Sequence, residues 1–165
     1  MLDLIIYNGN CYIEGNLNKT DIGVQNGKIT HIGDLKKEKT KEQIDVSEKL
    51  VLPGLIDTQV HFREPGSVDA ENLQTGSKAA IIGGITAVFE MPNTNPPTST
   101  FEEFNKKLKA AKNRMYCNYA FYFGATADNS DQLADLKKLE GCCGIKLFAG
   151  SSTGNLLVAK EKDIE

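Results

Sequence analysis

The chain has 165 residues, a net charge of -3, and ordinary proportions of hydrophobic and charged residues, 40% and 25%. This length allows one domain with a sizeable core, or one domain plus a small appendage. Lysines spread among acidic residues give no electrostatic basis for binding nucleic acid or an anionic membrane. The N-terminus lacks the basic segment of a secretory signal, and no apolar run approaches the roughly 20 residues that a membrane span needs. We therefore expect a soluble, cytoplasmic protein.

The cysteines support the same cellular setting. None of the four stands in a CxxC spacing, and two of them, Cys142 and Cys143, are adjacent. A disulfide framework or a zinc knuckle needs a different spacing, so we expect reduced thiols.

The first 50 residues have the pattern of short strands joined by turns. Strand-like segments occur at Leu4–Tyr7, Asp21–Val24 and Ile29–Ile32, and Asn26-Gly27 is a hairpin signal. We interpret residues 1–52 as a separate β-rich portion.

From residue 53 onward the pattern alternates between strand and helix. We expect strands at 55–62, 85–91, 116–123 and 143–148, with helices at 71–82, from the capping box Ser99-x-x-Glu102 onward, and from Ser130 to Gly141. Strand and helix units of this length predict an α/β fold with a parallel sheet and right-handed crossovers. The local pattern fits two folds, the first half of an eight-stranded barrel and a small doubly wound sheet.

The first of these strands carries a row of polar side chains. Because side chains alternate along a strand, Asp57, Gln59, His61 and Arg63 are predicted to share one face and to reach one edge of the sheet. Ligands of α/β folds bind at this edge. A lone histidine is more often satisfied by a neighbouring carboxylate in a core, but four polar side chains on one face would be costly to bury without a common function.

These residues carry a resemblance to a known family. The segment from Pro53 to Asp57, followed by Gln59-Val-His-Phe-Arg-Glu-Pro-Gly66, resembles the metal-binding signature of the amidohydrolase superfamily, and of the dihydroorotase branch in particular. The family pattern is Asp-x-His-x-His-x-Arg-Glu-Pro-Gly, so Gln59 stands where the first histidine belongs.

The resemblance also distinguishes between the two folds. It implies a TIM-type (β/α)8 barrel beside a small β-sandwich, with residues 1–52 in the sandwich and residues 53–165 as the first four βα units. Half a barrel would leave its last strand as an open edge. We therefore expect this chain to be the N-terminal portion of one more than twice as long.

The resemblance implies a metal centre. His61 and Lys146 match family ligands, and Gln59 occupies a third ligand position. Lys146 lies in Gly-x-Lys-x-Phe148, which resembles the carboxylated-lysine segment of related cyclic amidases. Burial favours a neutral amine, which can capture carbon dioxide as a carbamate, an anionic ligand able to bridge two divalent metal ions. The resemblance implies one or two zinc ions. The plainer interpretation is a lysine that snorkels into solvent.

Two further residues match substrate-binding positions of the family. Arg63 would hold a substrate carboxylate through its planar fork, although it could instead pair with Glu64 or Asp57. Asn93, in the loop that follows the second predicted strand, would hydrogen-bond the substrate; on composition alone this segment is simply a loop rich in Asn and Pro.

The resemblance implies that the complete protein hydrolyses the cyclic amide of dihydroorotate, or closes N-carbamoyl-aspartate into that ring. The family's proton-transferring Asp lies beyond residue 165, so we expect no catalytic acid or base in this portion and no activity from it alone. Gln59 leaves three outcomes open: one metal, two metals, or no catalysis. The alternatives are an inactive scaffold that partners aspartate carbamoyltransferase, and a hydantoinase- or allantoinase-like enzyme. A homodimer is also possible.

Overall fold

The computed structural model describes residues 1–152 and 154–164. The chain forms two compact units, Met1–Pro53 and Gly54–Glu165. This division lies within one residue of the predicted boundary. Each unit is described separately below.

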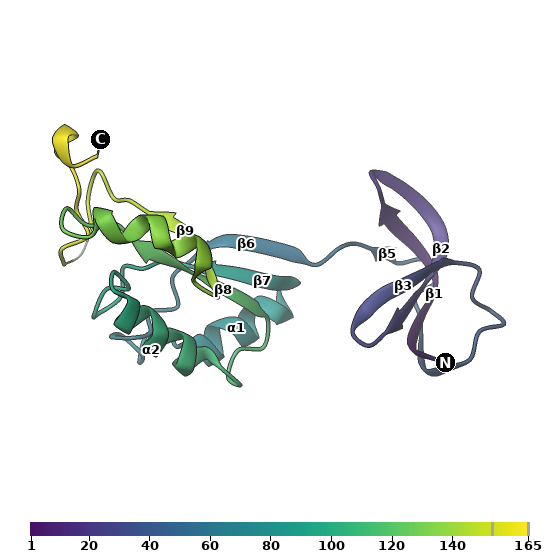
Figure 1. The fold of residues 1–165 in the computed structure, drawn as a ribbon. Coiled ribbons are helices and arrows are strands. Elements are labelled where there is room, and N and C mark those ends of the chain that lie inside the picture. Colours follow the sequence, from purple (N-terminus) through teal and green to yellow (C-terminus); the bar gives the residue numbers. More distant parts are fainter. Residues whose placement is uncertain (153, 165) are drawn as a thin grey trace. The chain divides into compact units, whose positions relative to one another are not determined.

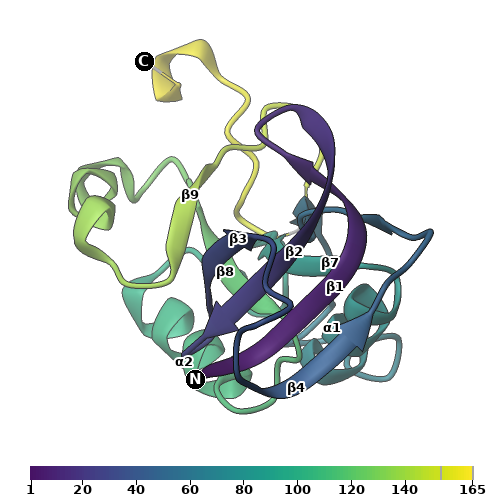
Figure 2. The ribbon, with the colours of Figure 1, turned by 90° about the vertical axis from the view of Figure 1, so that its right-hand side faces the viewer.

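The first unit is a five-stranded sheet in the order β3-β2-β1-β4, with β5 also paired to β1. The long β1 strand is antiparallel to β2 and parallel to β4 and β5 (Figure 2). The predicted β-sandwich stays a prediction, because the structure describes one sheet in this unit. The strands are β1 (Leu2–Ile13), β2 (Asn16–Gln25), β3 (Lys28–Gly33), β4 (Thr40–Asp45) and β5 (Leu50–Val51).

Tight turns set the register of this sheet. Asn26 and Gly27 have φ angles of 53° and 71°, and Glu14 and Gly15 have φ angles of 50° and 84°. Positive φ at both central residues is the geometry of type I′ hairpin turns, whose twist matches that of the flanking strands. The Asn-Gly hairpin signal is therefore confirmed. Strands β4 and β5 were not predicted, because their segments lack a continuous apolar alternation.

The second unit is a parallel four-stranded sheet in the order β6-β7-β8-β9. Figure 1 shows helices α1 and α2 on one face of it. The predicted α/β fold class is confirmed, since successive parallel strands are joined by helices, as in the first half of a barrel. The strands are β6 (Leu55–Val60), β7 (Ile85–Glu90), β8 (Asn118–Gly124) and β9 (Cys142–Lys146), and the helices are α1 (Leu73–Ile82), α2 (Phe101–Ala111) and the 3₁₀ helices η1 (Ser130–Lys138) and η2 (Glu161–Asp163).

Two predicted helix starts need correction. Helix α2 is capped by Thr100 instead of Ser99, and the Thr100 hydroxyl accepts from the Glu103 amide at 3.2 Å. The segment after Ser130 is a 3₁₀ helix without a side-chain cap. Its N-cap residue, Asn129, is buried and bonds the preceding turn and the Ser99 carbonyl instead, so its amide is not free to cap the helix.

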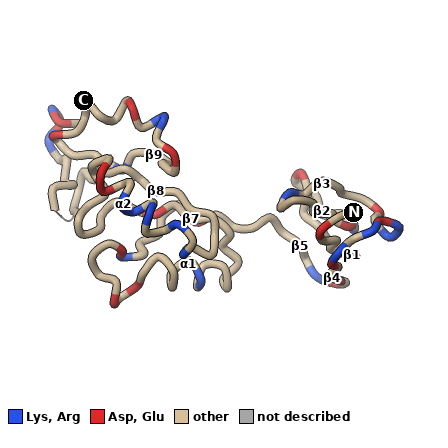
Figure 3. Tube along the Cα trace, turned by 60° about the horizontal axis from the view of Figure 1, so that its bottom comes forward, with Lys and Arg blue, Asp and Glu red and all other residues tan. Residues whose placement is uncertain are grey.

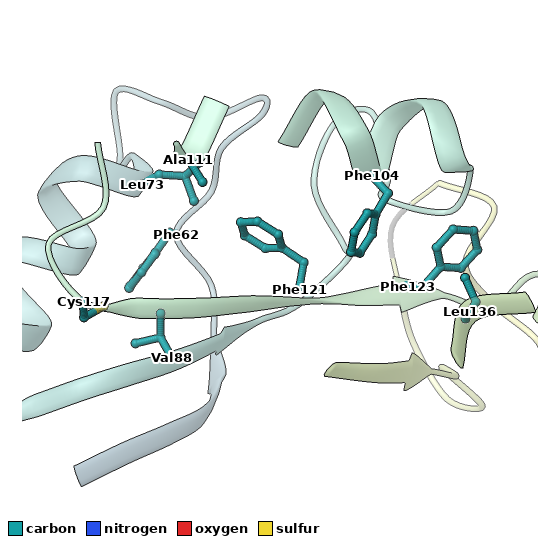
Figure 4. Packing of buried hydrophobic residues seen from close by; sticks show 9 residues of the cluster. All are labelled: Phe62, Leu73, Val88, Phe104, Ala111, Cys117, Phe121, Phe123 and Leu136. Carbon is teal, nitrogen blue, oxygen red and sulfur yellow. The ribbon is translucent and has the colours of Figure 1, made fainter. Parts of the chain in front are cut away.

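The core of the second unit lies between the sheet and its helices. Phenylalanines dominate it, and the Phe104 ring of α2 packs 6.2 Å from both the Phe121 and Phe123 rings of β8 (Figure 4). Phe62 packs against α1 at Gly76, where an added Cβ would lie 2.4 Å from its ring. Any side chain at residue 76 would therefore displace this ring. The buried cluster comprises Phe62, Leu73, Val88, Phe104, Ala111, Cys117, Phe121, Phe123 and Leu136.

Charged residues of both signs are interspersed along the chain (Figure 3). With 19 basic and 22 acidic residues, neither sign dominates. Among the described residues, no helix is both long enough and apolar enough to cross a membrane.

Candidate functional site

Two loops at the carboxyl ends of β6 and β7 enclose a pocket of about 400 Å³. A backbone hydrogen bond of 3.0 Å from the Asn95 amide to the Pro65 carbonyl ties the loops together. The two predicted substrate-binding residues, Arg63 and Asn93, both line this pocket. Its lining consists of Arg63, Pro65, Ser67, Asn93, Thr94, Asn95, Pro97 and Gly154.

Arg63 is placed by a turn and not by strand alternation. Strand β6 ends at Val60, and Arg63 is exposed with a φ angle of +58°. We expected Arg63 to share one strand face with Asp57, Gln59 and His61. This expectation is wrong, because the extended backbone ends before Arg63. Left-handed backbone is uncommon for a residue with a side chain and often marks a functional turn.

Glu64 does not pair with Arg63. Its carboxylate accepts two hydrogen bonds from Arg114, at 2.8 and 3.1 Å, and one from the Leu73 amide at the start of α1 at 2.9 Å. Burial raises the pKa of Glu64, but these hydrogen bonds outweigh it and the net pKa is lowered. The Arg63 guanidinium is thus left available for the pocket.

His61 lies directly after β6 and is partly buried. Its pKa is lowered, first by burial and then by the positive charges of Arg63, Lys107 and Lys146, while the Asn93 amide opposes the shift. The imidazole is therefore neutral near pH 7, which is the form that binds metal ions. His61 does not line the pocket itself but precedes the pocket-lining Arg63 by two residues.

Lys146 ends β9 and is half-buried. Its Nζ lies 5.1 Å from the centre of the Phe148 ring, and its charge reaches His61. Gln59 is exposed, and its backbone amide donates to the Asp57 carboxylate at 3.0 Å. The candidate ligands therefore come from the first and last strands of this sheet, near the carboxyl end of each.

These donors fit part of a divalent metal site. A neutral imidazole at His61 is a normal zinc ligand, and Lys146 would add two anionic oxygens if it were carboxylated. The Gln59 carbonyl oxygen is a poorer ligand than imidazole. Within residues 1–152 and 154–164, no three His, Cys, Asp or Glu side chains come together to hold a metal. Any metal here would need the carboxylated lysine, Gln59, or residues outside this chain.

A buried ion pair close to the pocket loop was not predicted from the sequence. Glu90 at the end of β7 pairs with Lys107 of α2, and both side chains are only 1% exposed. The signals were present: Lys107 falls three residues after Phe104, within the apolar stripe of its helix, and Glu90 ends a mostly apolar strand.

Comparison with known families identifies the chain. The profile of the Amidohydrolase family matches residues 50–151, which is more than half of the sequence. The chain belongs to this family, as its Asp57-to-Gly66 motif indicated.

Individual relatives have three different names. The chain is 39% identical to a dihydroorotase of Methanosarcina acetivorans over 98% of its own length and 34% of the relative's. It is 40% identical to an allantoinase of Desulfitobacterium hafniense over 89% of its length and 33% of the relative's. An L-hydantoinase from Arthrobacter aurescens matches in structure with a TM-score of 0.90 and 28% identity, over 99% of this chain and 37% of the other. The chain thus spans about a third of the length of these relatives.

Proposed function

We propose that the full-length protein is a metal-dependent cyclic amidohydrolase that acts on dihydroorotate. Membership of the Amidohydrolase family supports the reaction class. The similarity to a dihydroorotase over nearly the whole chain supports the substrate.

The observation that carries the proposal is that Arg63 and Asn93 line the same pocket. Dihydroorotate has a carboxylate next to a ring amide, and an exposed guanidinium can bind a carboxylate through two parallel hydrogen bonds. Asn93 Oδ1 is buried and makes no hydrogen bond of good geometry among the described residues, although it lies close enough to the His61 imidazole to favour its protonated form. A buried acceptor of this kind is costly unless a donor reaches it, and a ring N–H of the substrate would supply one.

The remaining residues prepare the site for hydrolysis. A metal ion, when bound, would polarise the amide carbonyl and acidify water. His61, held neutral by burial and nearby cations, and Lys146, once carboxylated, would hold that ion. The positive charges of Arg63 and Lys146 would also attract an anionic substrate to the pocket. Hydrolysis also needs a group that donates a proton to the leaving nitrogen, and we assign this role to none of these 165 residues.

A substrate panel tests this proposal. The full-length protein, loaded with zinc, would be assayed on dihydroorotate, allantoin and hydantoin. We expect the highest kcat/KM on dihydroorotate, because only that ring carries a carboxylate for Arg63. A clear preference for either uncharged ring would contradict the proposed substrate but leave the reaction class intact.

Allantoin is the second candidate substrate. The allantoinase relative is as similar to this chain as the dihydroorotase is, at 40% against 39% identity. Arg63 favours dihydroorotate because allantoin has no carboxylate. The panel compares the two directly.

The third candidate is an inactive scaffold for aspartate carbamoyltransferase, motivated by Gln59 at a ligand position. No turnover on any of the three rings by the zinc-loaded protein, together with co-sedimentation with aspartate carbamoyltransferase, would support this role. A homodimer without that enzyme would argue against it.

A further inference from the structure

We propose that the buried Glu90–Lys107 ion pair is a positioning device, which holds the loop that carries Asn93 in its ligand-binding conformation. The inference rests on the proposed function, in which Asn93 contacts substrate. Neither residue lines the pocket itself, so both would act through the loop.

Lys107 reaches the loop at both of its ends. Its Nζ donates to the Met91 carbonyl at 3.2 Å and to the Thr98 hydroxyl at 3.3 Å, and it also pairs with Glu90. An ammonium group has three donors, and these three partners account for all of them. The Phe121 ring lies 5.2 Å from the same nitrogen and closes the site on the core side.

The loop between these ends is closed on itself. The amides of Thr94 and Thr98 both donate to the Pro92 carbonyl at 2.9 Å, and the two threonine hydroxyls lie 3.3 Å apart. Asn93 therefore lies inside a short cycle of hydrogen bonds, and Lys107 fixes its base. The side chain of Asn93 projects from a segment that has little freedom to shift.

An ion pair is a costly way to fill this space. Two charges lose their hydration on burial, and a hydrophobic pair of similar volume is often as stable or more so. Burial raises the pKa of Glu90 to about 7, against the attraction of Lys107, and burial likewise lowers the pKa of Lys107. What an apolar pair cannot supply is hydrogen-bond donors for the Met91 carbonyl and the Thr98 hydroxyl. Positioning of the loop is therefore the property that the charges add.

The adjacent lysine provides a matched control. Lys106 lies on the same helix but is 58% exposed, and it pairs with Glu102 at 2.7 Å and Glu103 at 2.8 Å. It has no hydrogen bond to the 91–98 loop among those found in the structure. Lys106→Met removes the same charge one residue away.

The test uses the full-length protein and the paired variant Glu90→Gln/Lys107→Met, which removes both charges but keeps similar volume. The first measurement is hydrogen exchange at the amides of Thr94, Asn95 and Thr98. We expect faster exchange in the paired variant and no change in Lys106→Met. This measurement needs no substrate, so it remains valid even if the proposed function is wrong.

The second measurement is a kinetic double-mutant cycle with Asn93→Ala on the best substrate of the panel. We expect the paired variant to lower kcat/KM by about 10²-fold, the size of effect that a small misplacement of a binding group can have. In the Asn93→Ala background it should cause little further loss, because the positioned group is already absent. Lys107→Arg retains hydrogen-bond donors and charge. We therefore expect its kcat/KM to lie between those of the paired variant and the wild-type protein.

Two results would overturn the inference. Unchanged exchange of the three loop amides in the folded paired variant would mean that the ion pair does not hold the loop. Fully additive losses in the cycle, with melting temperature falling in parallel, would assign Glu90 and Lys107 a purely structural role. If the wild-type protein hydrolyses none of the rings, the proposed function fails, and the exchange result alone decides whether the loop is held.

Discussion

The two faces of the β6–β9 sheet differ in how far they are buried. The helix-covered face buries large apolar rings, of which Phe104, Phe121 and Phe123 are wholly inaccessible to solvent. On β6, the alternate positions Asp57 and Gln59 are exposed. The residues from Leu55 to Gln59 are all exposed, and the face opposite the helices carries the Phe89–Tyr122 ring pair. Hydrophobic burial thus fixes the strands from the helix-covered side, while polar groups gather at the carboxyl edge. The frame and the pocket can therefore be disturbed separately, except where Glu90 and Lys107 connect them.

The largest effect is expected on the covered face. Phe104→Ala should lower the free energy of unfolding by about 3–5 kcal/mol, because it removes buried ring contacts and leaves a cavity. Urea unfolding of the full-length protein measures this, with Lys109→Ala on the exposed side of the same helix as control. Equal midpoints for the two variants would contradict the packing described for α2.

Next comes the link between the frame and the pocket. Lys107→Met alone leaves Glu90 buried without its partner, and should cost about 3 kcal/mol of stability. Lys106→Met, on the exposed side, should cause no measurable change. Comparable melting temperatures for both variants would show that the buried pair has no special weight.

The pocket itself should respond in activity and not in stability. Arg63→Gln should reduce kcat/KM for dihydroorotate by about 10²-fold, since it removes a charge-assisted pair with the carboxylate. The loss should be much smaller on allantoin, which has no carboxylate. An equal loss on both rings would indicate that Arg63 does not bind the carboxylate.

Gln59 is a position at which a substitution should raise zinc affinity instead of lowering activity. Gln59→His restores the family's ligand type and should tighten zinc binding by about tenfold or more, because imidazole is a better zinc ligand than an amide oxygen. Competition with a chromophoric chelator measures the affinity, with Thr58→His as control for an added histidine. Unchanged affinity would place residue 59 outside the metal site.

The smallest effect concerns pH. The pKa of Glu64 is lowered in the folded protein, so the unfolded state binds its proton first as the pH falls. The resulting stability is present above about pH 4.5, the ordinary range for Glu, and is lost as the pH falls through the lower folded value. Glu64→Gln should therefore flatten the decline in melting temperature between about pH 5 and 3. Its exposed counterpart Glu140→Gln should leave the slope unchanged.

Much of the fold follows from local pattern. The signals for these elements are local properties of the chain: alternating polar and apolar residues, Pro-Gly turns and helix-length apolar stripes. This explains why the parallel strands and the two α-helices were predicted within a few residues. The 3₁₀ helix after Asn129 was not, because its cap residue bonds across to Ser99, a contact that depends on tertiary packing.

By itself, the sequence determined the family, the βα order and the identity of the candidate site residues, since a motif needs only residue types and spacing. Only the tertiary structure decided their neighbours. In the structure Glu64 pairs with Arg114, 50 residues away along the chain, and not with the adjacent Arg63. The fold also brought Arg63 and Asn93 to one pocket and buried Lys107 against Glu90. Such pairings depend on how a strand edge meets a helix in three dimensions, which spacing along the chain does not encode.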